Sequence, residues 1–163
     1  MKISILTATY NRAHTLPELY NSLLQNSNSG VHLEWLIMND GSADNTREIV
    51  QNFPQTDSLE IKYFHQQNQG KMTAINNLIP HVAGELIIEC DSDDYLTENA
   101  IKTINSKYKE LNNTNKLYAL VFLKQNENLQ TIGTNFKQNN YKSTMFDLYY
   151  KDGLTRRQSL SLY

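Results

Sequence analysis

The sequence predicts an α/β fold in which a mostly parallel, Rossmann-like sheet is flanked by helices. Two observations lead to this prediction. Short apolar segments alternate with segments whose apolar residues recur every three or four positions, which is the β-α order of a parallel sheet. Turn-forming residues such as Asn, Asp, Gly and Ser follow several of the apolar segments directly. With 163 residues, the chain is long enough for one domain with a substantial core.

The first half of the chain supplies strand-like and helix-like segments in alternation. The strands are predicted at residues 3–8, 33–38 and 59–64, and the helices at residues 15–25, 49–53 and 71–79. The first helix has a capping-box pattern, because Thr15 and Glu18 are three positions apart with a proline between them. Pro54 and Pro80 help to end the second and third helices.

The second half continues this order around a central apolar strand. Gly84 opens the strand, which runs through Cys90, and Thr97 is expected to cap a fourth helix. A fifth strand is predicted at residues 117–123. Cys90 is interpreted as a small buried side chain, because the sequence has no second cysteine with which it could form a disulfide.

The alternation is clear only as far as about residue 125. Residues 1–125 are therefore predicted to form one α/β domain, and residues 126–163 to form the start of a following region that is truncated or atypical. In this region Thr131 is expected on a strand and residues 145–150 on a short helix. The fold is accordingly expected to be incomplete at its C-terminus.

Composition and charge exclude several classes of protein. The formal charge is −2 and the basic residues are scattered, so no nucleic-acid partner is expected. The N-terminus does not look like a signal peptide, and no apolar run reaches the ~18 residues that span a bilayer. A cytoplasmic location is the default, and a peripheral association with a membrane stays open. Kinase, NTPase and dehydrogenase phosphate-binding motifs are absent.

The central apolar strand ends in three carboxylates within four residues, at Asp91, Asp93 and Asp94. Parallel sheets gather ligand sites at the carboxyl ends of their strands. Closely spaced carboxylates repel one another unless a cation neutralises them, and Mg²⁺ or Mn²⁺ prefers carboxylate oxygens together with phosphates. A divalent cation that carries a phosphorylated ligand is one interpretation. A turn followed by a helix cap is the other, and the motif alone does not decide between them.

Two further polar clusters follow the first and second strands, at residues 7–12 and 39–42. All three clusters are expected to meet at one edge of the sheet. Asp40 is well placed to accept hydrogen bonds from the ribose or base of a nucleotide, although an Asp-Gly turn explains this residue equally well by itself. Residues 68–71 add a flexible turn with Lys71 at a helix start, which suits a phosphate.

Taken together, these motifs resemble the nucleotide-sugar part of a family 2 glycosyltransferase. The resemblance covers about residues 2–125 and rests on residues 7–12, 39–42 and 68–71, on Ala74 and Asn76, and on residues 84–94. It implies a GT-A fold, with residues 1–125 as the nucleotide-sugar-binding domain and residues 126–163 as the start of the acceptor side. It also implies a donor sugar on UDP or a related nucleotide, a glycan or other hydroxyl acceptor, and inversion at the anomeric carbon.

The resemblance also assigns roles to single residues. Asp40 resembles the base-contacting aspartate of the family, and Asp91 and Asp93 resemble its DxD pair. Either Asp93 or Asp94 would reach Mn²⁺ or Mg²⁺, which acts as a Lewis acid on the departing diphosphate. The residues expected to bind the substrate are Thr7, Thr9, Tyr10, Arg12, Asp40, Lys71, Asp91, Ser92 and Asp93.

The resemblance leaves the general base unidentified, since in the family it comes from a later acidic segment. The later acidic residues, which are Glu98, Glu110, Glu127, Asp147 and Asp152, do not match that segment. The chain alone is therefore expected to transfer little or no sugar. Two alternatives stay open: a nucleotide-sugar-binding module without transferase activity, and a sugar nucleotidyltransferase, although the Gly-rich loop that would hold a triphosphate is absent after the first strand.

Other side chains invite a simpler interpretation. His14 and His65 have no partners at the spacing of metal ligands, so zinc is not expected. The late aromatic residues Tyr141, Phe146, Tyr149 and Tyr150 are candidates for an acceptor groove, but packing accounts for them equally well.

Overall fold

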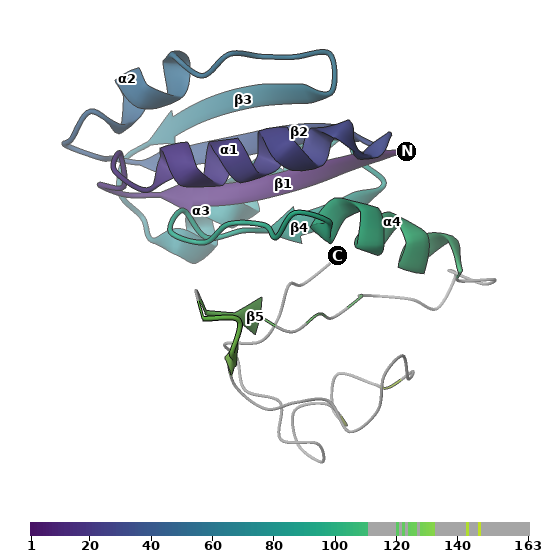
Figure 1. Cartoon of the computed structure of the whole chain (residues 1–163). Helices are drawn as coiled ribbons and strands as arrows, with labels where there is room; N and C mark the ends of the chain where they lie inside the picture. The colour runs from purple at the N-terminus through teal and green to yellow at the C-terminus, as the bar shows by residue number, and fades with distance from the viewer. Residues whose placement is uncertain are drawn as a thin grey trace.

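The computed structural model describes residues 1–110, 120, 122, 124–126, 128–132, 143 and 147. Its main feature is a parallel sheet of four strands in the order β3-β2-β1-β4 (Figure 1). The strands are β1 (Lys2–Thr9), β2 (His32–Asp40), β3 (Leu59–Gln66) and β4 (Leu86–Glu89). This arrangement confirms the predicted α/β class.

In the described part of the chain, four α-helices and two short 3-10 helices connect or follow these strands. They are α1 (Leu16–Asn26), η1 (Ser27–Ser29), α2 (Thr46–Gln51), α3 (Lys71–Leu78), η2 (Ile79–His81) and α4 (Ala100–Lys109). A separate antiparallel pair follows, formed by β5 (Lys124–Gln125) and β6 (Thr131–Ile132). Thr131 therefore lies on a strand, as predicted.

The strands bury apolar side chains on both faces of the sheet. Ile3, Ile5 and Trp35 pack with α1 and α4 on one face, whereas Leu6 and Leu36 pack with α3 on the other. Figure 1 shows α1 and α3 on opposite sides of the sheet. Successive residues of a strand point to opposite faces, so a doubly covered strand must be apolar nearly throughout. This explains the continuous apolar runs that predicted the strands.

One buried carboxylate fixes the entrance to β4. Glu34 is fully buried and accepts hydrogen bonds from Lys62 Nζ at 2.7 Å, from the Ala83 N–H at 2.6 Å and from the Ser4 hydroxyl. Burial by itself would raise the pKa of Glu34, but the bonds from Lys62, Ser4 and Ala83 hold it below its ordinary value. A Cβ at Gly84 would lie 2.6 Å from the Ser4 nitrogen, so only glycine fits beside this network.

One of the two predicted N-cap positions is right. Thr15 is the N-cap residue of α1, but its hydroxyl donates to the Ser92 carbonyl oxygen at 2.7 Å and makes no capping bond to the helix. The residue before α4 is Asn99 and not Thr97. The first turn of α4 is capped from another helix, because Asn26 Oδ1 accepts the Ile101 N–H at 3.1 Å. Tertiary contacts replace the local caps that the sequence pattern favoured.

The last predicted elements fall largely outside the described residues. Of the expected strand at residues 117–123, only Leu120 and Phe122 are described, and neither belongs to a strand. Of the expected helix at residues 145–150 only Asp147 is described, and the late aromatic residues lie outside the description. None of the helices in the described part of the chain is both long and apolar enough to cross a membrane.

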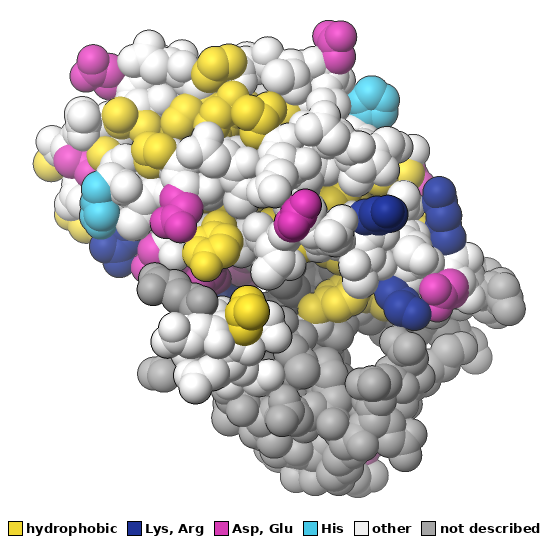
Figure 2. All heavy atoms as spheres, viewed as in Figure 1, with side chains coloured by type: hydrophobic (Ala, Val, Ile, Leu, Met, Phe, Trp, Pro, Cys, Tyr) yellow, Lys and Arg dark blue, Asp and Glu magenta, His cyan; other side chains and the backbone are white. Residues whose placement is uncertain are grey.

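Charged side chains are dispersed over the surface. On the face shown in Figure 2, Lys and Arg side chains occupy scattered positions among acidic ones. This face accordingly shows no basic patch among its described residues, in agreement with the formal charge of −2.

Candidate functional site

The order of the strands determines where a ligand site is expected. From β1 the chain proceeds outward through β2 to β3, and α3 then returns it to β4 on the other side of β1. The loops that follow the neighbouring strands β1 and β4 therefore run in opposite directions from one point of the carboxyl edge. Open α/β sheets bind ligands at such a point. Residues 10–15 and 90–99 border it, and both segments contain residues that the sequence singled out.

Asp40 at the end of β2 holds the loop that precedes α3. Asp40 is only 3% exposed. Its carboxylate accepts hydrogen bonds from the Gln69 N–H at 2.9 Å, the Gly70 N–H at 2.8 Å and Gln66 Nε2 at 2.8 Å. Burial by itself would raise the pKa of Asp40, but these three bonds hold it below its ordinary value. Asp40 is thus a structural acceptor in this conformation, and its contact with a base stays a prediction.

The loop at residues 68–70 crosses closely over the end of β2. A Cβ at Gly41 would lie 2.9 Å from the Asn68 nitrogen, and Gly41 has a φ of 78°, so a side chain would be strained there twice over. The Gln69 and Gly70 amides already donate to Asp40. The turn is therefore held in place by these bonds, and the binding of a phosphate beside Lys71 stays a prediction.

The loops after β1 and β2 are joined by a second set of bonds. The Asn11 N–H donates to Ser42 Oγ at 2.9 Å, and Asn11 Oδ1 accepts the Ala43 N–H at 2.8 Å. Asp44 accepts the Ala13 N–H at 3.1 Å. Asn11 has a φ of 53°, a left-handed conformation that asparagine tolerates better than most residues. These bonds fix the loop that carries Tyr10 and Arg12.

Residues Asp91–Asp94, which we call the acidic turn, are paired with cationic side chains from three different elements. Lys71 Nζ at the start of α3 lies 2.5 Å from Asp91 Oδ1 and 2.8 Å from Glu89 Oε1. Arg12 NH2 lies 3.6 Å from Asp93 Oδ2, and Lys124 Nζ on β5 lies 2.5 Å from Asp94 Oδ2. Burial by itself would lower the pKa of Lys71, but the pairs with Asp91 and Glu89 raise it well above its ordinary value.

Side chains of α1 and of Thr15, which precedes it, bind the backbone of the acidic turn and of the segment after it. Asn26 Nδ2 donates to the Thr97 carbonyl oxygen at 3.0 Å, and Ser22 Oγ accepts the Leu96 N–H at 3.1 Å. With the Thr15 bond to Ser92, three polar side chains of this region bind the backbone of residues 92–97. Since Ser22 and Asn26 are buried, breaking these bonds would leave polar groups without partners.

The sequence-predicted residues of β1 have unequal positions. Thr7 is fully buried, and its hydroxyl accepts the Trp35 indole N–H at 2.9 Å, so the expected contact of Thr7 with a substrate is not supported. Thr9 is also buried, but its hydroxyl oxygen has no hydrogen-bond partner among the described residues. Tyr10 is 50% exposed. Buried hydroxyls are normally bonded, so the Thr9 hydroxyl needs a further partner, such as water or a ligand.

The comparison with protein families decides the relationship. The model of glycosyl transferase family 2 matches residues 4–161. The chain belongs to this family. Ser92 is buried and its carbonyl oxygen accepts the Thr15 hydroxyl, so this residue anchors the acidic turn, and its expected contact with a substrate stays a prediction.

Several curated glycosyltransferases are similar to this chain in sequence. An uncharacterized glycosyltransferase of Mycoplasma pneumoniae is 35% identical over 106 residues, which are 64% of this chain and 36% of that protein. The GalNAc(5)-diNAcBac-PP-undecaprenol beta-1,3-glucosyltransferase of Campylobacter jejuni is 36% identical over 111 residues, which are 67% of this chain and 35% of that protein. The chain spans about a third of the length of the curated relatives it matches first.

Solved structures show the same fold. Residues 1–349 of S. aureus TarS in complex with UDP-GlcNAc align with a TM-score of 0.63 and 24% identity, over 90% of this chain and 38% of that chain. At this identity the likeness concerns the fold alone. It confirms the GT-A type of fold that the resemblance implied.

The acidic turn of this family 2 chain suits a divalent cation in one particular mode. The described residues contain no group of three His, Cys, Asp or Glu side chains that could hold a metal by themselves. The side chains of Asp93 and Asp94 are 53% and 41% exposed, and among the described residues only one oxygen of each is paired with a cation. Mg²⁺ is usually held by one or two carboxylates together with substrate phosphates, and this donor set fits that mode.

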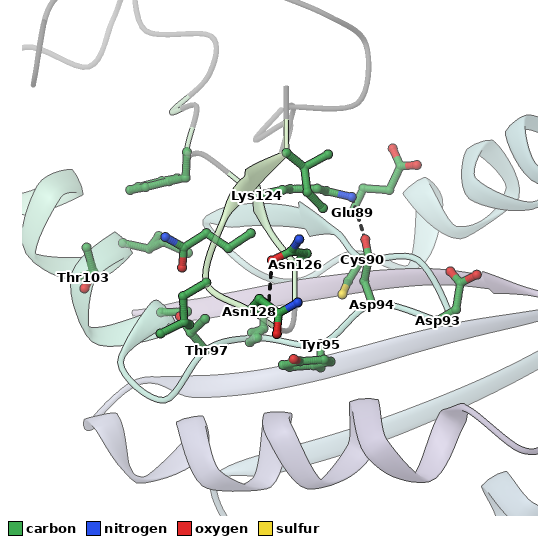
Figure 3. A pocket seen from close by; sticks show the side chains of 17 residues that line it. Glu89, Cys90, Asp93, Asp94, Tyr95, Thr97, Thr103, Lys124, Asn126 and Asn128 are labelled. Atoms are coloured by element: carbon green, nitrogen blue, oxygen red, sulfur yellow. Dashed lines mark hydrogen bonds and ion pairs between the residues drawn. The ribbon is translucent and has the colours of Figure 1, made fainter. Parts of the chain in front are cut away.

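A cavity of about 670 Å³ lies beside the acidic turn, between α4 and the β5–β6 hairpin. Figure 3 shows Asp94, Tyr95, Thr97, Thr103, Lys124 and Asn126 among the side chains that line it. Cys90 also lines the cavity, and burial together with Asp94 and Asp91 raises the pKa of its thiol to about 12. Cys90 is therefore an inert, buried thiol, as predicted.

Sequence patterns missed three residues that shape the site, Ser22, Asn26 and Lys124, and included Asn11 only as a member of the cluster at residues 7–12. Asn11, Ser22, Asn26 and Lys124 act through bonds to residues distant in the chain. Ser22 and Asn26 carry one recognisable signal, since both are polar side chains at buried positions of an otherwise apolar helix face. Lys124 offered no signal, because nothing local distinguishes it from an exposed lysine.

Proposed function

We propose that this chain is the donor-binding part of a glycosyltransferase, which moves a sugar from a nucleoside diphosphate to a hydroxyl group of a glycan or other acceptor. The observation that carries the proposal is the meeting of the β1 loop and the acidic turn at one point of the sheet edge, in a chain of glycosyltransferase family 2. UDP is the proposed nucleotide, since the structurally similar TarS was solved with UDP-GlcNAc. The family match favours this function over a sugar nucleotidyltransferase.

The nucleoside would lie over the end of β1. Tyr10 offers an exposed ring on which a base can stack, and the unpaired Thr9 hydroxyl lies directly before it. Asp40 would act here by holding the loop at residues 66–70, and a direct bond to the nucleoside would require one of its present donors to move.

The diphosphate would lie between the cations of the site and the acidic turn. Arg12 and Lys71 come from opposite sides of the switch point and both pair with the turn. Arg12 is the freer of the two, because its contact with Asp93 is 3.6 Å long and both side chains are about half exposed. A phosphate can therefore recruit Arg12 at small cost, whereas Lys71 would keep Asp91 in place.

Mn²⁺ or Mg²⁺ is proposed as the cofactor, held by Asp93 together with the diphosphate. When bound, the cation supplies Lewis-acid stabilisation of the departing diphosphate. Asp91 and Ser92 would orient the turn through Lys71 and Thr15, so that the exposed Asp93 carboxylate faces the ligand.

The acceptor would approach from the cavity beside α4, and residues 126–163 would begin its binding region. Direct displacement by the acceptor hydroxyl from the face opposite the diphosphate would invert the anomeric carbon. That hydroxyl must lose a proton to a base. Each described carboxylate around the cavity is already paired: Glu89 with Lys71, Asp93 with Arg12 and Asp94 with Lys124. The base is therefore expected outside this set, and a binding module without transferase activity is the second candidate.

Calorimetric titration with UDP, GDP and ADP in the presence of Mn²⁺ tests the nucleotide site. We expect UDP to bind most tightly, Tyr10→Ala to weaken it by roughly tenfold through lost stacking, and Thr9→Val to weaken it by roughly threefold to tenfold. Tyr108→Ala, on α4, serves as a control for loss of a tyrosine. Equal affinity of both site variants and the wild type would overturn the proposed site. A donor-hydrolysis and transfer assay then separates an enzyme from a binding module.

A further inference from the structure

The ion pair between Lys124 and Asp94 joins two parts of the chain that are 30 residues apart in sequence. Lys124 begins the β5–β6 hairpin, whereas Asp94 ends the acidic turn, and their charged atoms lie 2.5 Å apart. The two side chains are 29% and 41% exposed, so water shields the pair only partly. Figure 3 shows the Asp94 carboxylate turned toward Lys124, while the Asp93 carboxylate lies away from it.

The hairpin that carries Lys124 is well formed. Asn126 Oδ1 accepts the N–H groups of Asn128 and Gln130, each at 3.0 Å, and the Asn126 N–H donates to the Gln130 carbonyl oxygen at 2.9 Å. The backbone at Lys124 is therefore held in place by a hydrogen-bonded turn. The Lys124 ammonium group is held where it meets Asp94 across one wall of the cavity.

The three carboxylates of the acidic turn differ in how firmly each is paired. Asp91 and Asp94 have short contacts of 2.5 Å with lysines, but the contact of Asp93 with Arg12 is 3.6 Å long and more exposed. Short charge-assisted bonds are stronger than long ones, and exposed pairs contribute little. An incoming cation would consequently displace Arg12 more easily than Lys124.

We propose that Lys124 is the resident cation of Asp94: it docks the β5–β6 hairpin on the acidic turn and withdraws Asp94 from the carboxylates that a divalent cation uses, which leaves Asp93 as the ligand. A divalent cation at Asp94 would lie close to the Lys124 ammonium and be repelled by it. Lys124 is thus a positioning residue for the acidic turn. The metal half of this inference rests on the proposed function, and the docking half does not.

A charge-balanced double-mutant cycle tests the metal half. Binding of Mn²⁺ in the presence of UDP is measured by the loss of the free-Mn²⁺ electron paramagnetic resonance signal, for wild type, Lys124→Met, Asp94→Asn and the double variant. Methionine keeps the aliphatic stem and removes the charge. Lys107→Met is the matched control, because it removes the same charge from a lysine that pairs with Glu110 on the surface of α4.

The cycle has a distinctive expected pattern. Lys124→Met frees the Asp94 carboxylate and should tighten Mn²⁺ binding roughly tenfold, whereas Asp94→Asn frees the ammonium and should weaken it by a similar factor. The double variant should return to within about threefold of wild type, since neither charge is left. Lys124→Arg should behave as wild type. If Asp94→Asn and the double variant are equally weak while Lys124→Met matches Lys107→Met, Asp94 is itself the ligand and the inference is overturned.

Hydrogen exchange without metal or nucleotide tests the docking half. Lys124→Met should speed exchange of the amides in residues 124–132 by roughly threefold to tenfold, while amides of β1 stay protected. Unchanged exchange in this hairpin would overturn the docking. If no variant binds Mn²⁺ with UDP, the metal-assisted part of the proposed function fails together with the metal half, and hydrogen exchange decides the docking of the hairpin by itself.

Discussion

Asp40 and the acidic turn lie at the same edge of the sheet, yet their surroundings are opposite. Asp40 is 3% exposed and accepts three hydrogen bonds from neutral donors, two of them backbone amides. Asp93 is 53% exposed and faces the end of the long Arg12 side chain at 3.6 Å. A ligand can replace this arginine side chain by letting it swing aside, but it can replace a backbone amide only by moving the loop. Aspartate thus serves as scaffold at one strand end and as an exchangeable site at the other.

Removal of the Asp40 carboxylate should have the largest effect on stability. Asp40→Ala leaves the Gln69 and Gly70 amides without their acceptor, and we expect it to lower the free energy of unfolding by about 3–4 kcal/mol. Urea unfolding measures this loss. Asp57→Ala, at an exposed aspartate, is the control and should change stability by less than about 0.5 kcal/mol. A small effect of Asp40→Ala would mean that the loop at residues 66–70 is held by something other than Asp40.

The second-largest loss of stability is expected from removal of the Asn26 side chain, which binds the segment after the acidic turn. Asn26→Ala removes the acceptor of the Ile101 N–H and the donor to the Thr97 carbonyl oxygen, so it should cost about 2–3 kcal/mol of unfolding free energy. Asn21→Ala, on the exposed side of the same helix, controls for helix propensity. Equal stability of the two variants would show that these buried bonds are replaced by water.

Acid should remove the contribution of the two buried carboxylates, Glu34 and Asp40, to the free energy of unfolding. The ordinary pKa values are 4.5 for Glu34 and 3.8 for Asp40, and both are lowered in the folded chain. Their contribution is present above these values and is lost as the pH falls through the lower folded ones. We expect stability to be flat from pH 7 to about pH 5 and to fall by about 1–2 kcal/mol by pH 3. Glu34→Gln should flatten this fall, and an unchanged slope in that variant would contradict the assignment.

The smallest effect on stability is expected from loss of the ion pair between Arg12 and Asp93. Arg12→Met removes an exposed, 3.6 Å ion pair with Asp93 and should change the free energy of unfolding by no more than about 0.5 kcal/mol. Thermal unfolding without ligand measures it. A loss above about 2 kcal/mol would mean that Arg12 is part of the scaffold and is not free to move to a diphosphate.

The sequence predicted the sheet because doubly buried strands must be apolar along their whole length, and the helices that cover it because their apolar residues share one face. It also placed the acidic turn correctly at the end of β4. The sequence also placed Thr15 correctly at the start of α1, but it did not reveal that the Thr15 hydroxyl bonds Ser92 or that Asn26, and not Thr97, caps the first turn of α4, because these partners are distant in the chain.

The partners of the site residues were the least predictable part. Nothing in the local pattern reveals that Asp40 accepts its bonds from a loop 26 to 30 positions later, or that Thr7 points into the core beneath Trp35. Lys71 was expected at a phosphate and pairs with Glu89 and Asp91 in the structure. Strand ends identify the edge at which polar residues gather, but only the packed loops determine which of them face a ligand.

The most direct test of whether Asp93 of the acidic turn exchanges Arg12 for a divalent cation is thermal unfolding with Mn²⁺ and UDP, added singly and together. We expect the two ligands together to raise the melting temperature by more than the sum of their separate effects, because the diphosphate completes the coordination of a cation that Asp93 holds alone. Asp93→Asn should abolish this excess while Glu60→Gln, at an exposed carboxylate of β3, leaves it unchanged. Strictly additive shifts in the wild type, or an undiminished excess in Asp93→Asn, would contradict the account.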